Sequence, residues 1–366
     1  MKIKFDSNFT LDFGAANQTR VYGFLYENFQ NDILKNQVFY EIEVTFKDFN
    51  GNYVFEINRR EVHINNKIPA SKIEQIANVA GQAIFPIRIK LKRDGQIDEI
   101  LNQNEIAKRW SIERKNIFEY YKGSNAETII SKIDDLFLDE CRLMQSINQN
   151  WFFHLFFKPL YVSYSEKLRI KHIWKSPVFG NQFIEYGAVQ TVQEKYSHDD
   201  KISINVDGIS IDERTIDEIR SGYNFSKSKF SESEAACVES KFNVDYKLYT
   251  EDRSIFSVNG TFDTKIDENT NHKIQVEIYH LAESSSYRPW SDAGMKENAR
   301  IFQAWQESID DDIIDFRKPK WQVPNTPKPK IPKPPGERIE LFVGVGPTVK
   351  TDSGFWHWIK SIFKKK

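Results

Sequence analysis

The chain has 366 residues, of which 40% are hydrophobic and 14% aromatic, enough for one large or two medium domains with a substantial core. Its 51 basic and 52 acidic residues nearly cancel, so no overall charge draws it to nucleic acid, and no nucleic-acid partner is expected. The high content of Phe (28) and Tyr (15) favours strands over helices.

The two cysteines and the N-terminal segment indicate the cellular compartment of the protein. Cys141 lies in an apolar helical run and is expected in the core, and two distant thiols predict neither a zinc site nor a disulfide framework. The first residues carry charges where a signal peptide is apolar. The longest dense apolar run, Trp151 to Phe157, is far shorter than the roughly 20 residues that span a bilayer. We expect a cytoplasmic protein, and non-classical export would leave no readable sign.

The first block of the chain, residues 1–65, predicts strands. Aromatic and β-branched residues alternate over much of it, and two long runs flank Asn50-Gly51. This dipeptide is a strong hairpin signal, because both central positions of the turn need a positive φ. The expected strands cover residues 5–13, 20–29, 38–46 and 53–64.

The central block changes to a helical period. Ile73, Ile76, Ala77 and Ala80 recur at helical spacing, and Gly123 separates two later helical runs. Asp94-Gly95 predicts a turn between two short strands. The expected elements are helix 69–83, strands 85–92 and 96–100, helices 104–121 and 125–147, and a final buried helical turn over 151–157.

A second strand-rich block follows and is again rich in alternating patterns. Asn259-Gly260 is a second hairpin signal within it. After this block, residues 284–317 predict a helix with an acidic end at Asp310, Asp311, Asp312 and Asp315. The expected strands cover 167–174, 183–196, 201–206, 241–249, 254–263 and 273–280, with a short helix over 212–220.

Segregated blocks of strands and helices favour an α+β fold. We expect one or more curved antiparallel sheets packed on a central helical block, with a C-terminal Pro-rich extension. The two strand blocks form one curved sheet or two domains, and we favour a shared core because residues 159–166 lack linker composition. The predicted segments are 1–165, 166–322, a Pro/Lys-rich spacer 323–336 and a docking tail 337–366.

Motifs of known chemistry are missing from the sequence. The seven histidines show no metal-binding spacing, Gly344-Val-Gly346 precedes Pro347 and no helix, and no nucleophile signature occurs. Asp263 and Glu277 are expected on the outward face of strands. We therefore predict no catalytic, cofactor-binding or metal-ligating residues and lean against an enzyme, although a site assembled from distant residues stays open.

The C-terminal tip is the best candidate site. The proline-rich spacer before it is expected to be extended, and a helix from 355 to 363 would place Phe355, Trp358, Ile359 and Ile362 on one face. Such a short helix should order only on binding. Its targets are a groove on a partner protein or an anionic membrane surface, unless the tip folds back on the body. The predicted partner-binding residues are Phe355, Trp356, Trp358, Ile359, Ile362, Phe363, Lys360 and Lys364.

The leading functional hypothesis is a non-enzymatic interaction protein, such as an adaptor, chaperone-like carrier or assembly component, that docks a partner protein through this tail. One alternative is a carrier of lipid or another apolar ligand, in which Trp151 to Phe157 form part of the pocket wall. A second alternative is an effector or cargo component of a bacterial secretion apparatus. The Asn-, Lys-, Ile- and Phe-rich usage is typical of low-GC bacteria.

Overall fold

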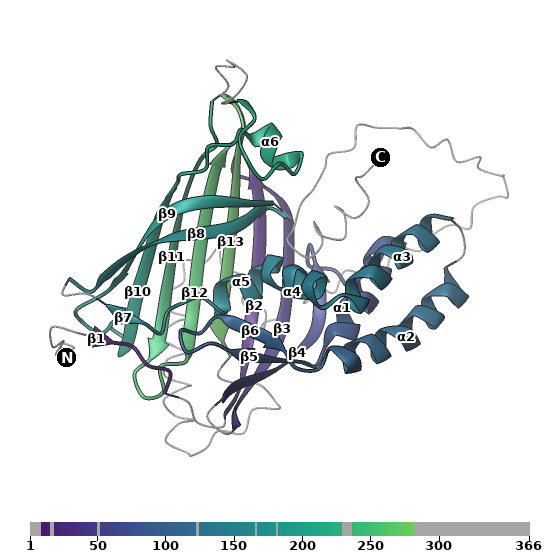
Figure 1. The fold of residues 1–366 in the computed structure, drawn as a ribbon, viewed down its shortest axis with the longest axis horizontal. Helices are drawn as coiled ribbons and strands as arrows, with labels where there is room; N and C mark the ends of the chain where they lie inside the picture. Colours follow the sequence, from purple (N-terminus) through teal and green to yellow (C-terminus); the bar gives the residue numbers. More distant parts are fainter. Residues whose placement is uncertain are drawn as a thin grey trace, which may run out of the picture. The chain divides into compact units, whose positions relative to one another are not determined.

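The computed structural model describes residues 9–14, 18–49, 52–121, 124–164, 167–180, 182–228 and 236–281. These residues form an 11-stranded sheet, a separate two-stranded ladder and a group of helices (Figure 1). The strands are β1 Phe9–Thr10, β2 Gln18–Gln30, β3 Ile33–Phe49, β4 Asn52–Ile64, β5 Ile87–Leu91, β6 Ile97–Ile100, β7 Ser163–Tyr164, β8 Arg169–Phe179, β9 Gln182–Val192, β10 Lys201–Ser210, β11 Glu239–Tyr249, β12 Ile255–Lys265 and β13 Asn271–His280. The helices are α1 Lys72–Ile84, α2 Gln103–Tyr120, α3 Ser124–Leu138, α4 Glu140–Gln149, α5 Trp151–Phe156 and α6 Ile216–Arg220.

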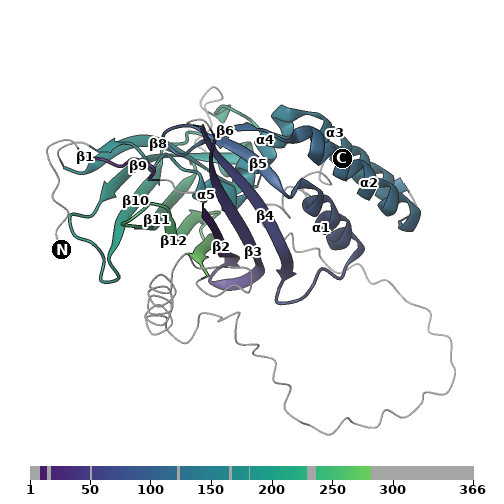
Figure 2. The ribbon, with the colours of Figure 1, turned by 90° about the horizontal axis from the view of Figure 1, so that it is seen from below.

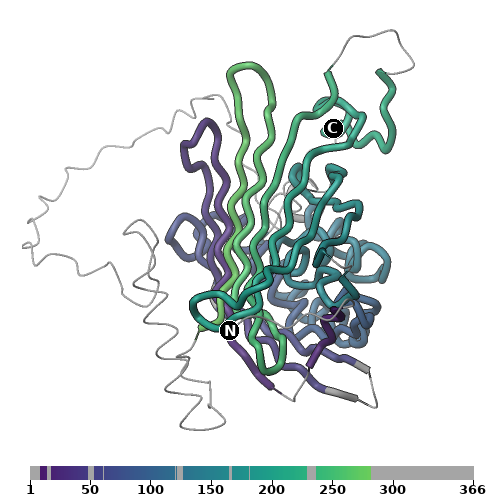
Figure 3. Tube along the Cα trace, turned by 90° about the vertical axis from the view of Figure 1, so that its left-hand side faces the viewer, coloured from purple at the N-terminus to yellow at the C-terminus, as the bar shows by residue number. Residues whose placement is uncertain are grey.

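The large sheet joins the two strand blocks. Its order is β6-β5-β4-β3-β2-β13-β12-β11-β10-β9-β8, and each neighbouring pair is antiparallel. The joint is the β2–β13 ladder, in which Phe24 faces Ile278, so the first and last long strands of the described chain run side by side (Figure 3). The α+β class with antiparallel pairing is confirmed. The curvature of the sheet and the four segment boundaries stay predictions, and residues 282–366 lie outside the described residues.

The turn signals have mixed outcomes. β3 and β4 form the predicted hairpin, in which Phe49 faces Asn52, while Asn50-Gly51 themselves lie outside the described residues. Gly95 has the positive φ, 95°, that a turn between β5 and β6 requires. The hairpin predicted at Asn259-Gly260 is wrong: both residues lie within β12, where Gly260 pairs with Val244 on one side and Val276 on the other.

Side-chain caps mark the starts of α1 and α4. Ser71 and Glu74 form a capping box at α1, so that helix begins at Lys72 and not at Pro69. The single long helix predicted over 125–147 is wrong, because Asp139 accepts a hydrogen bond from the Arg142 amide and starts α4 as a separate helix. The core position predicted for Cys141 is also wrong: this residue is exposed, since α4 buries the opposite side chains, among them Leu143 and Ile147.

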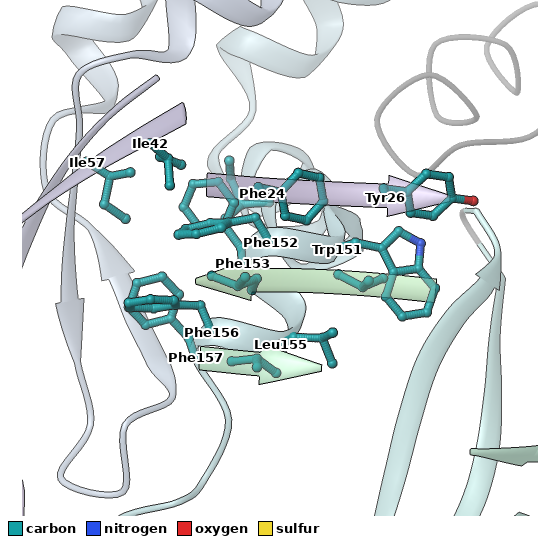
Figure 4. Packing of buried hydrophobic residues seen from close by; sticks show 14 of the residues in the cluster. Phe24, Tyr26, Ile42, Ile57, Trp151, Phe152, Phe153, Leu155, Phe156 and Phe157 are labelled. Carbon is teal, nitrogen blue, oxygen red and sulfur yellow. The ribbon is translucent and has the colours of Figure 1, made fainter. Parts of the chain in front are cut away.

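The short helix α5 occupies the centre of the hydrophobic core, as the buried helical turn predicted there. Asn150 caps it by accepting from the Phe152 amide, and every residue from Trp151 to Phe156 is buried. Its aromatic side chains spread between Ile42 and Ile57 at one end and Tyr26 at the other (Figure 4). α5 and α4 lie against one face of the sheet, and α1, α2 and α3 lie to the side of β4 (Figures 1 and 2).

Candidate functional site: an apolar slot beside α5

A slot lies where the start of β2, the end of β3 and the C-terminal end of α5 meet. The cavity volume of the slot is about 40 Å³, within a total space of about 520 Å³ between the lining atoms that includes open solvent. The slot is therefore narrow, and its cavity is smaller than the roughly 300 Å³ at which ordinary small-molecule sites begin. The lining residues are Phe13, Gly14, Gln18, Arg20, Tyr22, Val44, Phe46, Phe55, Leu91, Gly95, Phe156, Phe157, Tyr161, Asp252, Ser254 and Ile255.

Aromatic rings make most of the wall. The Phe13 ring packs edge-on against Tyr161, with centroids 4.7 Å apart, and lies 5.1 Å from Phe46. On the α5 side, the Phe156 ring packs edge-on against Tyr22 at 5.1 Å. Because each ring packs against another ring, the wall is ordered without a ligand.

One polar pair interrupts this wall. Arg20 on β2 and Asp252, before β12, form an ion pair with a nitrogen–oxygen distance of 2.8 Å, and both side chains are nearly buried. Arg20 also donates to the Ser254 hydroxyl, which in turn donates to Asp252 at 2.7 Å. The guanidinium lies 4.1 Å from the centroid of the Tyr249 ring. Asp252 therefore compensates the Arg20 charge, and the slot does not demand an anionic ligand.

The tyrosine hydroxyls of the slot are directed at backbone carbonyls. Tyr22 donates to the Ile255 carbonyl at 2.8 Å, and Tyr161 donates to the Arg253 carbonyl at 3.0 Å. Burial raises the pKa of Tyr161 well above its ordinary value, so it stays neutral at physiological pH. These tyrosines offer mainly ring carbon to the slot, and neither is poised for proton transfer.

A buried polar cluster continues beyond the slot. The Tyr249 hydroxyl lies 2.6 Å from His280 Nδ1, and the Lys201 ammonium is 4.8 Å from the Tyr249 ring centroid. Burial, together with the Arg20 and Lys201 charges, holds the pKa of His280 well below its ordinary value. His280 is therefore neutral at physiological pH.

A serine–histidine pair lies elsewhere in the core. His154 Nε2 is 3.2 Å from Ser176 Oγ, and the Trp174 indole donates to the same oxygen at 2.7 Å. This resembles a nucleophile and its base. However, Ser176 is 0% exposed, so no substrate reaches it, and the contact satisfies buried polar groups.

Metal-binding geometry does not occur in the part of the chain that the structure describes: no three His, Cys, Asp or Glu side chains gather there to hold an ion. Asp263 faces Lys273 and Glu277 faces Leu25 in the sheet register, so these two carboxylates do not form a pair. In the described part of the chain, no helix is long and apolar enough to cross a membrane.

The site predicted from the sequence and the slot are different places. All eight tail residues, from Phe355 to Lys364, lie outside the described residues. Of the aromatic run considered as a pocket wall, Phe156 and Phe157 line the slot, whereas Trp151 to Leu155 pack in the core. Sequence reasoning missed Arg20 and Asp252, which stand 232 positions apart, and no local pattern marks them as partners.

Comparisons with known proteins add little. The chain matches no protein-family profile, and a search of curated proteins finds no relative. Among solved structures, one of lipovitellin, titled for its lipid–protein interactions, is similar with a TM-score of 0.37 and 11% identity. The similarity covers 75% of this chain but only 26% of that one, and it carries no conclusion about function.

Proposed function

We propose that this protein binds a thin apolar molecule, such as an acyl or isoprenoid chain, in the slot beside α5, and acts as its carrier. The observation that carries this proposal is the slot itself, whose aromatic walls are ordered by ring-to-ring contacts. Its narrowness favours a single chain over a bulky ring system.

The polar groups of the slot support an uncharged ligand. The hydroxyls of Tyr22 and Tyr161 donate to backbone carbonyls, and Arg20 pairs with Asp252. A charged head group placed beside them would be desolvated next to an ion pair whose charges already compensate each other, which is unfavourable. The Gln18 side chain also lines the slot and is suited to accept or donate to one polar end of the ligand.

Diphenylhexatriene, a neutral rod that fluoresces in apolar surroundings, tests the proposal. We expect the protein to bind it, and Val44→Phe, which fills the slot from β3, to weaken binding about tenfold, since a filled slot no longer accepts the rod. Ile112→Phe, at a position 61% exposed on α2, is the matched control and should bind like the native protein. Thermal unfolding of each variant verifies that it folds.

Equal binding by native protein and folded Val44→Phe would refute the carrier proposal, as would absence of any binding. Native mass spectrometry of protein purified without detergent provides an independent check. A co-purified apolar molecule that is absent from Val44→Phe would identify the ligand directly.

The docking tail stays a separate proposal, resting on the aromatic and basic residues of the tip. A partner protein is its proposed target, with an anionic membrane as the alternative, and export with a secretion apparatus would be one setting for it. Trp358→Ala with Ile359→Ala should abolish capture of that partner without changing the stability of the body. Retained capture by this double variant would contradict the tail proposal and leave the slot proposal untouched.

A further inference from the structure

Three isoleucines gather on the face of the sheet opposite to α5. In the register of β8, β9 and β10, Ile173 faces Gly187, and Gly187 faces Ile209. Residues directly opposed in a sheet point to the same side, so Ile173 and Ile209 flank a glycine that has no side chain. Ile211 leans over this glycine, since a Cβ built there would lie 3.2 Å from Ile211 Cγ2. We call Ile173, Ile209 and Ile211 the isoleucine patch.

The patch is open to solvent. Ile173 is 62% exposed, Ile209 is 72% exposed and Ile211 is 51% exposed. By contrast Trp174, next to Ile173 but on the other side of β8, is buried and packs against Phe242. The apolar residues that these strands contribute to the core, such as Trp174, point to the other face of the sheet, so the isoleucine patch lies outside the core. Single exposed isoleucines need no explanation, but a group of neighbours on one face does.

Basic side chains border the patch along the edge strand β8. Arg169, Lys171 and Lys175 alternate with the core-facing residues and so lie on the same face as Ile173. β8 contains no acidic residue, and Glu185 on β9 pairs with Lys175 at 2.6 Å. On the far side of the patch, Asp207 of β10 lies on the same face and accepts a hydrogen bond from Asn243. The positive charge beside the patch is therefore carried by Arg169 and Lys171 on the edge strand β8.

We propose that the isoleucine patch and the basic residues of β8 dock this protein on an anionic lipid surface. Apolar side chains that enter the interfacial layer, with cations beside them for anionic head groups, are the two components of peripheral membrane binding. Charges on an edge strand also discourage pairing with other strands, which accounts for the lysines but not for the isoleucines. Pro177, which has no amide hydrogen, further disfavours an added strand on β8.

This inference does not depend on the slot. The patch lies across β8 to β10, whereas the slot is built from β2 to β4 and the end of α5. If the lipid-docking proposal fails, the carrier proposal is unaffected. Diphenylhexatriene binding should be unchanged in the patch variants described next.

Vesicle flotation with the full chain tests the proposal. The probes are vesicles of phosphatidylcholine alone and of equal parts phosphatidylcholine and phosphatidylserine. We expect binding to the mixed vesicles, weakened by salt because part of the attraction is electrostatic. Ile173→Asp with Ile209→Asp should lower the bound fraction about tenfold, since both apolar anchors are replaced by repelled charges. Lys171→Glu should lower it less.

The matched control is Ile112→Asp with Leu138→Asp, which makes the same chemical change at positions 61% and 76% exposed on α2 and α3. It should float like the native chain. Three results would overturn the proposal: no flotation of the native chain, undiminished flotation of the patch variant, or equal loss in the control. If light scattering shows a dimer for the native chain and a monomer for the patch variant, while both bind vesicles equally, the patch would instead be a contact between two copies of the chain.

Discussion

Tyr246 on β11 donates a hydrogen bond to the carbonyl of Leu155 on α5 at 3.0 Å, and both residues are 0% exposed. The two partners stand 91 positions apart. The last carbonyls of a helix have no partner within that helix, so a buried helix end needs donors from elsewhere. The Tyr246 hydroxyl is such a donor, and this hydrogen bond connects α5, at the centre of the core, to β11 of the sheet.

Tyr246→Phe should therefore destabilise the fold by about 1–3 kcal/mol, since it leaves the Leu155 carbonyl buried without this donor. Urea unfolding measures the change. Tyr223→Phe, at a position 38% exposed, is the control and should change the free energy of unfolding by less than about 0.5 kcal/mol. Similar values for the two variants would mean that the Tyr246 hydroxyl has no such role.

Gly208→Ala should also destabilise the protein. A Cβ at this position of β10 would overlap the ring of Phe242, its partner on β11. That ring is itself fixed between Trp174 and Phe262, with centroid distances of 5.1 and 5.3 Å. Overpacking of this kind costs about 1–3 kcal/mol. Phe242→Leu should relieve the overlap, so the double variant should be more stable than the sum of the two single changes indicates. Strict additivity in chemical unfolding would argue against the contact.

Glu277 should make stability depend on pH. Burial, with a smaller contribution from Glu27, raises the pKa of this carboxyl from 4.5 to about 7. Because the folded-state pKa lies above the unfolded one, the stability that Glu277 contributes is fully present below about pH 4.5. It is lost as pH rises through about 7, and the total change is about 3 kcal/mol.

Glu277→Gln should remove this dependence. The variant should be more stable than the native protein at about pH 8, and the advantage should shrink as the pH falls toward 4.5. Unfolding midpoints across this range provide the test, with the exposed Glu239→Gln as control. Parallel pH profiles for native protein and Glu277→Gln would contradict the raised pKa.

Both thiols should react in the native state. Cys141 and Cys237 are exposed, so a thiol reagent should modify two groups rapidly without denaturant. Cys141→Ser should leave one reactive thiol. A slow group that appears only on unfolding would show that one cysteine is covered.

The short-range features were readable from the sequence because local chemistry decides them. Alternating aromatic residues predicted most strands, and helical spacing predicted α1 and α2. The capping box at Ser71 and Glu74 was also present in the sequence, although the helix was expected to start at Pro69. Where two helices follow one another, as at Asp139, periodicity alone did not reveal the boundary.

Asn259-Gly260 shows where local reasoning fails. The dipeptide predicts a turn when taken alone. In the sheet it lies between two strands that satisfy its backbone, and a Cβ at Gly260 would lie 3.3 Å from a methyl carbon of Leu155. A side chain at this position would press on α5, a constraint that appears only once α5 and β12 are brought together.

By itself, the sequence determined the class of the protein: strands, then helices, then strands, each set by side-chain period and turn chemistry over a few residues. Tertiary structure alone decided which strands are neighbours, because a ladder such as β2–β13 depends on burying both strands in one core. The Arg20–Asp252 pair, the slot and the isoleucine patch have the same origin. Each brings together residues from separate strands, and nothing in the local sequence records which strands will meet.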